Sequence, residues 1–251
     1  TSVLSMPTST RESVFKINIA GSENIGLYFN HANANTNPFN VKDYTLNSTN
    51  GTSNTLVYVG KGYVDLAAQS KASTDNTINM TGGSKNIGIY TKGDDLNTAG
   101  KITITNSDDS TGIFAENSGT VTNTGVISAS GKSVKAMVVS NSTITNSAKI
   151  DVTGTALSAT DGAVGLAAMN KGTITHTGGG TIAVDGGSSV GAYGGTNGTV
   201  DITGGTIKAT GGAFNTLASG GTVKLSGTVI DTGQKSLAFY ADNTGGTGRI
   251  N

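Results

Sequence analysis

The chain has 251 residues, including 38 glycines, two prolines and no cysteine or tryptophan, and its 16 basic and 16 acidic side chains give no net charge. This balanced, scattered charge excludes both the basic surface of a nucleic-acid-binding protein and a polybasic patch for anionic membranes. No stretch approaches the roughly 18 apolar residues of a membrane-spanning helix, and the first residues lack the features of a targeting segment.

One short phrase repeats along the chain, and its regular spacing indicates an ordered protein. Six of the eight steps between copies are 23 to 26 residues long, and the other two, 39 and 30, fit one period with an inserted loop. A repeat of this length predicts a solenoid. The copies are Ile25–Tyr28, Val64–Ala67, Ile87–Tyr90, Thr111–Phe114, Val134–Met137, Val164–Ala167, Val190–Tyr193, Phe214–Leu217 and Leu237–Tyr240.

The segment 30–63 interrupts the repeat between its first two copies, and we expect it to be irregular. Long loops that leave a rigid scaffold often carry function. Aromatic rings beside amide and carboxylate groups suit both sugar faces and protein-binding hot spots. The alternative is that the segment caps or pads the rod. The ligand-binding residues expected in this segment are His31, Asn37, Phe39, Lys42, Asp43 and Tyr44.

Each repeat in 79–251 holds three short segments in which apolar and polar residues alternate. A second phrase, Gly-Thr followed by Val or Ile, recurs at 119–121, 172–174, 198–200 and 221–223. Alternation over four or five residues predicts half-buried strands, and no apolar stripe of helical spacing is present. Three strands per repeat predict an all-β fold, a single-chain parallel β-helix of about nine rungs stacked about 4.8 Å apart.

Two inward-facing columns of side chains are expected to stack from rung to rung. Asn123 and Asn146 are predicted to form an internal amide ladder that His176 continues. The first column is expected to run through Ile102, Val121, Ile144, Ile174, Val200 and Val223. The second, two residues further along each strand, is expected to run through Ile104, Asn123, Asn146, His176, Ile202 and Leu225.

We expect no catalytic residue, metal or cofactor. The stretch Gly187–Gly191 matches the G-x-S-x-G pattern of a nucleophilic serine, but it lies between short strands with no helix after it. The pairs Asp94–Asp95 and Asp108–Asp109 offer carboxylates for Ca²⁺, but turns favour aspartate without any metal. The carboxylates that a glycan-active enzyme would need fall on different rungs, at Asp151, Asp161, Asp185 and Asp231.

Three stretches carry a resemblance to a known family. They are "GSKNIGIYTKG…TAGKITITN", "DDSTGIFAENSGTVTNTGVISASG" and "SVGAYGGTNGTVDITGGTIKATGG". They resemble passenger domains of type V (monomeric) autotransporters, in particular the large fusobacterial-type outer-membrane adhesins, whose passengers repeat G-I-[YF] and N-x-G-x-I phrases. The resemblance covers about 79–251. It implies a right-handed β-helix at the cell surface, tethered to the bacterial outer membrane by a barrel absent from this sequence.

On this resemblance, we expect residues 1–251 to form one continuous β-helix fragment of a longer adhesin passenger with a role in cell adhesion and virulence. Its expected partners are host-cell or bacterial surface receptors, protein or glycan, with no nucleic acid and no insertion into a membrane. The alternatives are a purely structural stalk, a self-associating passenger and a glycan-active β-helix enzyme.

Overall fold

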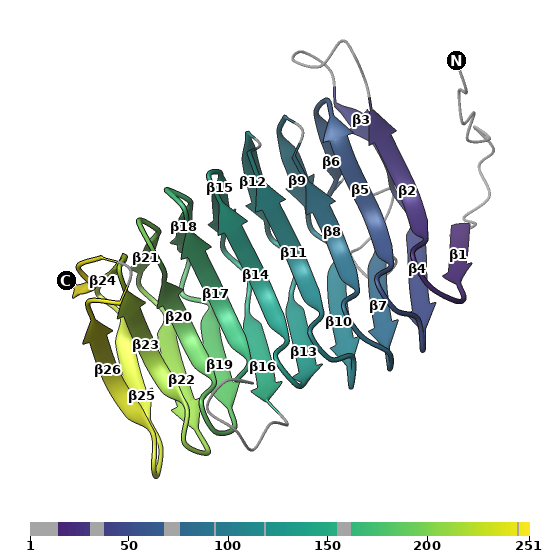
Figure 1. Ribbon diagram of the computed structural model, residues 1–251. Helices are drawn as coiled ribbons and strands as arrows, with labels where there is room; N and C mark the ends of the chain where they lie inside the picture. Colours follow the sequence, from purple (N-terminus) through teal and green to yellow (C-terminus); the bar gives the residue numbers. More distant parts are fainter. Residues whose placement is uncertain are drawn as a thin grey trace.

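The computed structural model describes residues 15–30, 38–67, 76–92, 94–117, 119–154, 162–244 and 246–251. Within these residues, the 27 strands form three parallel sheets of nine strands each, and there is no helix. The chain visits the three sheets in turn and so builds nine stacked rungs of a right-handed β-helix (Figure 1). The predicted fold class is therefore confirmed.

Each sheet takes one strand from every rung, so its strands stack in chain order. Sheet 1 contains β1 (Phe15–Ile19), β4 (Tyr44–Thr49), β7 (Thr77–Thr81), β10 (Lys101–Thr105), β13 (Ile127–Gly131), β16 (Ile150–Gly154), β19 (Thr181–Asp185), β22 (Thr206–Thr210) and β25 (Val229–Thr232). Sheet 2 contains β2 (Ile25–Asn30), β5 (Thr55–Lys61), β8 (Ile87–Thr91), β11 (Thr111–Glu116), β14 (Lys135–Ser140), β17 (Val164–Met169), β20 (Val190–Gly194), β23 (Phe214–Ser219) and β26 (Leu237–Asp242). Sheet 3 contains β3 (Phe39–Asn40), β6 (Val64–Leu66), β9 (Leu96–Thr98), β12 (Thr120–Asn123), β15 (Thr143–Asn146), β18 (Thr173–His176), β21 (Thr199–Thr203), β24 (Thr222–Ser226) and β27 (Arg249–Ile250).

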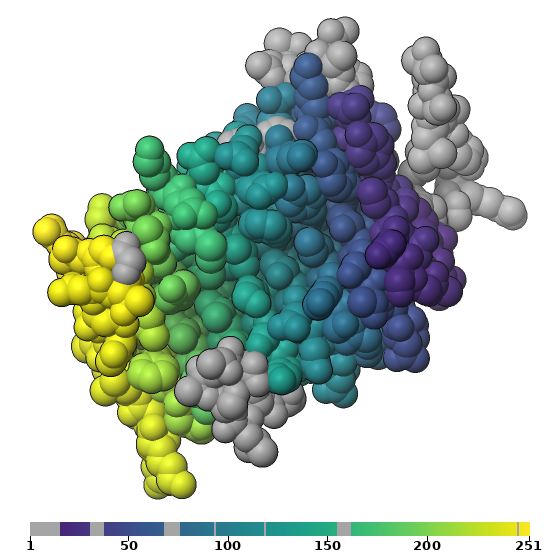
Figure 2. Space-filling view, in the orientation of Figure 1, coloured from purple at the N-terminus to yellow at the C-terminus, as the bar shows by residue number. Residues whose placement is uncertain are grey.

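Stacking of rungs satisfies the backbone. A single rung leaves the N–H and C=O groups of its strands unpaired, and the rungs on either side supply the missing hydrogen bonds. Contacts are therefore made mainly between neighbouring rungs, and the sequence colours run in order from one end of the molecule to the other (Figure 2). Among the described residues there is no helix long and apolar enough to span a membrane.

The core is a set of apolar columns inside the solenoid. Val121, Ile144 and Ile174 are register partners in sheet 3 and are fully buried. Burying one such side chain contributes about 1.5–3 kcal/mol relative to leaving it exposed. Because successive residues of a strand face opposite sides, the threonine that directly follows each of these residues faces outward.

The first member of each predicted inward column is wrong. Ile102 and Ile104 belong to sheet 1, where Ile102 pairs with Ile78 and Ile127. In sheet 3 the residue before Val121 is Leu96, and Thr98 precedes Asn123. The cause is that β9 has only three residues and lacks the Gly-Thr phrase, so the alternating run that follows it matches the pattern better. From Val121 and Asn123 onward both columns are confirmed.

The expectation that 30–63 is irregular is also wrong, because β3, β4 and β5 lie within it. Strand β5 stacks between β2 and β8, while the weak copy Val64–Ala67 contributes its first three residues to β6 in sheet 3. The true spacings at this corner are 30 residues from Asn24 to Asn54 and 32 from Asn54 to Asn86. Leu56 occupies the position that is glycine in five of the other eight rungs, so the copy in β5 is hard to recognise.

A polar ladder, buried from Asn54 onward, holds the corner between sheets 1 and 2 in the first rungs. The Asn54 side-chain oxygen accepts a hydrogen bond from the Asn24 backbone N–H at 2.9 Å, and the Asn86 side-chain oxygen accepts one from the Asn54 N–H at 3.0 Å. The Asn86 N–H in turn donates to the Ser110 hydroxyl at 3.0 Å. The residue just before each ladder member has a left-handed backbone, with φ between 49° and 60° from Glu23 to Asp109. This repeated corner directs the strands of sheet 2 along the same path in each rung.

Candidate functional site

Four neighbouring strands of sheet 2 carry an aromatic side chain at the same outward-facing position. These residues, Tyr28, Tyr58, Tyr90 and Phe114, form what we call the aromatic column, and they are register partners from rung to rung. Each follows an inward-facing apolar residue such as Ile89, which is fully buried. Because strand side chains alternate between the two faces, the buried neighbour places the aromatic ring on the outer surface.

The rings of the aromatic column contact one another along the stacking direction. The ring centroids of Tyr28 and Tyr58 are 5.2 Å apart, those of Tyr58 and Tyr90 5.0 Å, and those of Tyr90 and Phe114 5.5 Å. The Tyr28–Tyr58 pair is stacked, with an interplanar angle of 29°, and the other two pairs are tilted, at 52° and 47°. All three centroid distances lie within the range that aromatic pairs prefer. Tyr28 is 58% exposed and the other three are half-buried. A contiguous, partly exposed aromatic surface is the kind of patch that binds partners.

Beyond the fourth rung the same outward position changes character. Val138 and Ala167 occupy it in the next two rungs, and both are buried. Tyr193 and Leu217 follow them in register. Tyr193 is therefore an outward tyrosine with aliphatic residues on both sides, on the same face but outside the aromatic column.

An open groove of about 310 Å³ lies along the N-terminal part of the aromatic column. Its apolar part comes from the rings of Tyr58 and Tyr90 and from aliphatic side chains, of which Ile25 is 51% exposed. Its polar part comes from the corner between sheets 1 and 2. The lining residues are Glu23, Asn24, Ile25, Ser53, Thr55, Tyr58, Ile87 and Tyr90.

One tyrosine of the aromatic column is held by a carboxylate. The Tyr90 hydroxyl donates a hydrogen bond to Glu116, two residues beyond Phe114 on the next rung. Burial of the ring, this hydrogen bond and the negative charge of Glu116 all raise the pKa of Tyr90. The phenol therefore stays protonated at neutral pH, and the hydrogen bond restricts the orientation of its ring.

Charged side chains of both signs lie at the corners and strand ends beside the aromatic column, so this face carries no field of a single sign. They include Glu23, Asp109, Glu116, Lys61, Lys85 and Lys92. Among the residues that line the groove, Glu23 is the charged one.

No family model, curated protein or solved structure matches this chain.

The predicted ligand-binding residues that the structure describes lie outside the groove. His31 and Asn37 fall outside the described residues. Phe39, in β3, is 40% exposed, and its ring centroid lies 5.3 Å from that of Phe29. Lys42 is exposed. None of the predicted residues that the structure describes lines the groove.

The last two predicted residues lie where β4 begins. Asp43 is half-buried and has a φ of 56°, which marks a turn. Tyr44 is fully buried in the core, its backbone N–H donates to the Asn76 side-chain oxygen at 3.3 Å, and burial raises its pKa. A side chain in this position does not contact a ligand from solvent. Phe39, Lys42 and Asp43 stay predictions.

The residues weighed for catalysis occupy structural positions. Ser189 is fully buried, and its hydroxyl accepts a hydrogen bond from the Ala163 N–H at 3.2 Å. His176 is fully buried; its Nδ1 lies 2.7 Å from the Asn146 amide nitrogen and its Nε2 3.2 Å from the Gly180 oxygen. Because the amide must donate, Nδ1 accepts and the proton sits on Nε2. Burial lowers the pKa of His176, so the ring is neutral.

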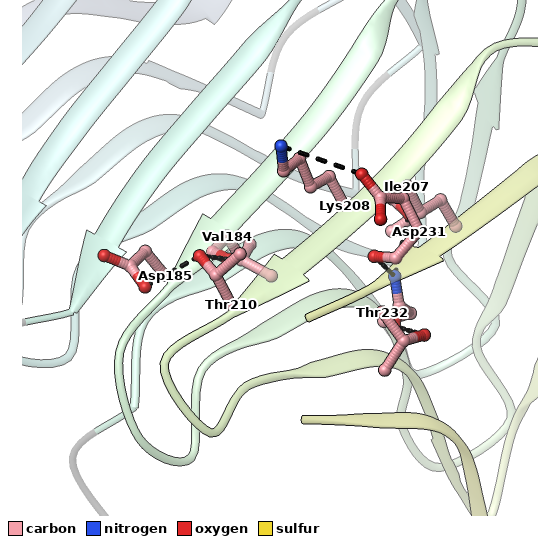
Figure 3. A network of polar contacts seen from close by, with 8 residues as sticks. Val184, Asp185, Ile207, Lys208, Thr210, Asp231 and Thr232 are labelled. Atoms are coloured by element: carbon pink, nitrogen blue, oxygen red, sulfur yellow. Dashed lines mark hydrogen bonds and ion pairs between the residues drawn. The ribbon is translucent and has the colours of Figure 1, made fainter. Parts of the chain in front are cut away.

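The carboxylates of sheet 1 are engaged with neighbours (Figure 3). Asp185 accepts a hydrogen bond from the Thr210 hydroxyl at 2.7 Å, and Asp231 lies 3.7 Å from the Lys208 ammonium. Asp151 pairs with Lys149 at 2.7 Å; Asp161 lies outside the described residues. In the part of the chain that the structure describes, no group of three or more His, Asp or Glu side chains is placed to hold a metal.

A second groove, of about 300 Å³, lies at the corner between sheets 2 and 3 near the C-terminal end and contains Arg249. The backbone N–H groups of Asn197, Gly198 and Thr199 there donate to carbonyls at 2.7–2.9 Å. These donors are therefore occupied, and the groove does not offer the free N–H groups of an anion site.

The sequence itself carries a signal for the aromatic column. The aromatic fourth residue of the repeated phrase, as in Ile87–Tyr90, helped to define the period. Period-two alternation from the inward Ile89 already places Tyr90 outside. Tyr58 was missed for another reason, because its rung was assigned to the irregular segment.

Proposed function

We propose that this chain is part of a surface-displayed adhesin passenger of the autotransporter type, and that it attaches to other cells through the aromatic column on sheet 2. The observation that supports the proposal is that four successive rungs repeat an outward aromatic residue. A solenoid braced by backbone hydrogen bonds on both sides of each strand presents these rings in a pre-ordered array. Pre-ordering lowers the entropy lost on binding.

The alternatives explain this feature less well. A stalk needs only an inward apolar face, so it gives no reason for exposed rings in register on its outside. A glycan-active enzyme needs a pair of free carboxylates close together, whereas Asp151, Asp185 and Asp231 each contact a neighbour. Attachment needs no reactive group. Tyrosine side chains can supply it, because they contribute much of the binding energy at many interfaces.

The proposal is tested with beads that carry the purified chain and are applied to host and bacterial cells. The test variant is Tyr58→Ala/Tyr90→Ala, and the matched control is Tyr193→Ala, which removes a tyrosine from the same face outside the aromatic column. If each tyrosine contributes more than about 1 kcal/mol to binding, the double variant should attach roughly 10-fold less or weaker still, and the control should attach as the unmodified chain does. Circular dichroism checks that all three proteins are folded.

Two results would overturn the proposal. One is attachment of the double variant equal to that of the unmodified chain. The other is no attachment of the unmodified chain to any cell, which would favour the stalk. Beads that clump with one another and ignore cells would favour self-association instead.

A further inference from the structure

We infer that the groove over β2, β5 and β8 binds a neutral glycan whose sugar rings lie along the stacking direction of the rungs. This inference rests on the proposed function and specifies its ligand. It is carried by the lining of the groove, its size, the spacing of its rings and the charge around it.

The lining of the groove matches the two sides of a sugar ring. A pyranose has a face of C–H groups and a rim of hydroxyl groups. Tyr58, Tyr90 and Ile87 supply an aromatic and aliphatic surface for the C–H face. Glu23 and Ser53, on the corner beside them, supply acceptors and a hydroxyl for the rim.

The size of the groove suits a short stretch of glycan rather than a protein surface. Its volume of about 310 Å³ lies at the lower end of the ~300–1,000 Å³ typical of small-molecule sites. A stable protein–protein interface buries about 800 Å² on each partner and would need a broad face. Val138 and Ala167 end the aromatic column after four rungs, so the aromatic surface is short.

The spacing of the rings suits a ligand that repeats on the same length. The two rings that line the groove, Tyr58 and Tyr90, have centroids 5.0 Å apart, a distance set by strand pairing, and Ile25 supplies the apolar contact on β2. In an extended glycan, each sugar adds about the length of one pyranose ring to the chain. That length is similar to the ~4.8 Å that separates paired strands. A chain laid across β2, β5 and β8 therefore places about one sugar on each rung.

The charge around the aromatic column selects against polyelectrolytes. Among the described residues, the groove is lined by one carboxylate, Glu23, and by no cationic side chain, so it offers no attraction to a sulfated or uronic-acid polymer. The Glu116 carboxylate orients Tyr90 and retains acceptor capacity for a sugar hydroxyl. Binding through such contacts should change little with salt, because exposed charge pairs contribute little to it.

The test is an array of immobilised oligosaccharides that includes neutral β-linked glucose and N-acetylglucosamine oligomers and, beside them, sulfated and uronic-acid oligomers. We expect the unmodified chain to bind neutral oligomers with little dependence on salt. Tyr58→Ala should reduce this binding about 10-fold or more. Tyr58→Phe, which keeps the ring, and Tyr193→Ala, outside the groove, should bind as the unmodified chain does. Binding of charged oligomers only, no binding of any neutral oligomer, or neutral binding unchanged by Tyr58→Ala would overturn the inference.

A parallel bead experiment separates this inference from the proposed function. Target cells are treated either with periodate, which destroys sugar diols, or with protease. Attachment that depends on the aromatic column but survives periodate and is lost after protease leaves the adhesin proposal standing and refutes the glycan. Loss of attachment after periodate supports both.

Discussion

Replacing Asn146 by alanine removes the centre of the buried polar ladder in sheet 3. Its amide nitrogen donates to Nδ1 of His176 at 2.7 Å and to the carbonyl of Ala148 at 2.9 Å, and its oxygen accepts from the Asn123 amide at 2.7 Å. Asn123, Asn146 and His176 are all fully buried. Water therefore cannot replace the lost partner without opening the core.

The size of the effect follows from the groups left unsatisfied. A buried polar group without its hydrogen bond costs about 1–3 kcal/mol. The His176 ring nitrogen and the Ala148 carbonyl both lose their donor, whereas the Asn123 amide keeps its hydrogen bond to the Gly125 carbonyl at 2.8 Å and is not counted. We therefore expect Asn146→Ala to lower the free energy of unfolding by about 2–6 kcal/mol. Asn47 provides the control, because it forms a similar ladder with Asn18 and Asn79 at 2.9 Å on the outer face of sheet 1. Water can replace these bonds, so Asn47→Ala should cost less than about 1 kcal/mol.

The assay is urea unfolding followed by circular dichroism, together with native-state hydrogen exchange of the amides in β12, β15 and β18. Hydrogen exchange is needed because repeat proteins open in parts as well as globally. Equal losses of stability in Asn146→Ala and Asn47→Ala would refute the reasoning. So would faster exchange that is confined to strands far from β15.

Three other predictions concern a titration, a backbone position and a surface pair. Burial lowers the pKa of His176 from 6.5, so the unfolded chain binds more protons than the folded protein. Stability should therefore fall as the pH drops below about 6.5, by at most ~1.4 kcal/mol per pH unit for this residue. Urea unfolding at several pH values should show a weaker dependence in His176→Asn, and an unchanged dependence would contradict the assignment. Gly83 and Gly227 both have positive φ, of 71° and 61°, but an added Cβ would overlap a backbone oxygen of the preceding rung at Gly83 and has nothing within 4 Å at Gly227. Thermal unfolding should show that Gly227→Ala lowers the free energy of unfolding by about 1–2 kcal/mol and that Gly83→Ala lowers it clearly more. Equal unfolding midpoints for the two variants would contradict the close contact between rungs at Gly83. The ion pair of Lys208 and Asp231 is about half exposed, with side chains 52% and 51% accessible, so Lys208→Ala should change stability by less than about 0.5 kcal/mol in the same melts.

The sequence predicted the inside of the solenoid better than its surface. The ladder from Asn123 through Asn146 to His176 could be read from the chain, because a polar residue at an inward position stands out against apolar neighbours. The rung containing β5 could not, because Leu56 stands at a position that is glycine in most of the other rungs. In β14 a continuous apolar run hides the alternation, and the copy placed at Val134–Met137 is one residue out of register, since Lys135 pairs with Thr111.

The candidate site shows the same division. Expectation centred on 30–63 because that segment departs from the pattern, yet Tyr44 lies in the core. The aromatic column belongs instead to the regular part of the repeat. Its members are 24 to 32 residues apart in the chain, and only the pairing of β2, β5, β8 and β11 brings their rings within 5.5 Å of each other.

By itself the sequence determined the fold class, the three strands per rung and most of the inward columns. These depend on periodicity, which is a local property, because the side chains of a strand alternate whatever its partners are. The tertiary structure decided which strand of one rung lies on which strand of the next, and hence which outward residues meet. Register depends on backbone hydrogen bonds between residues far apart in the chain and on the lengths of the loops that connect them. Where insertions interrupt the repeat, neither the repeated sequence phrase nor its spacing specifies these hydrogen bonds or loop lengths.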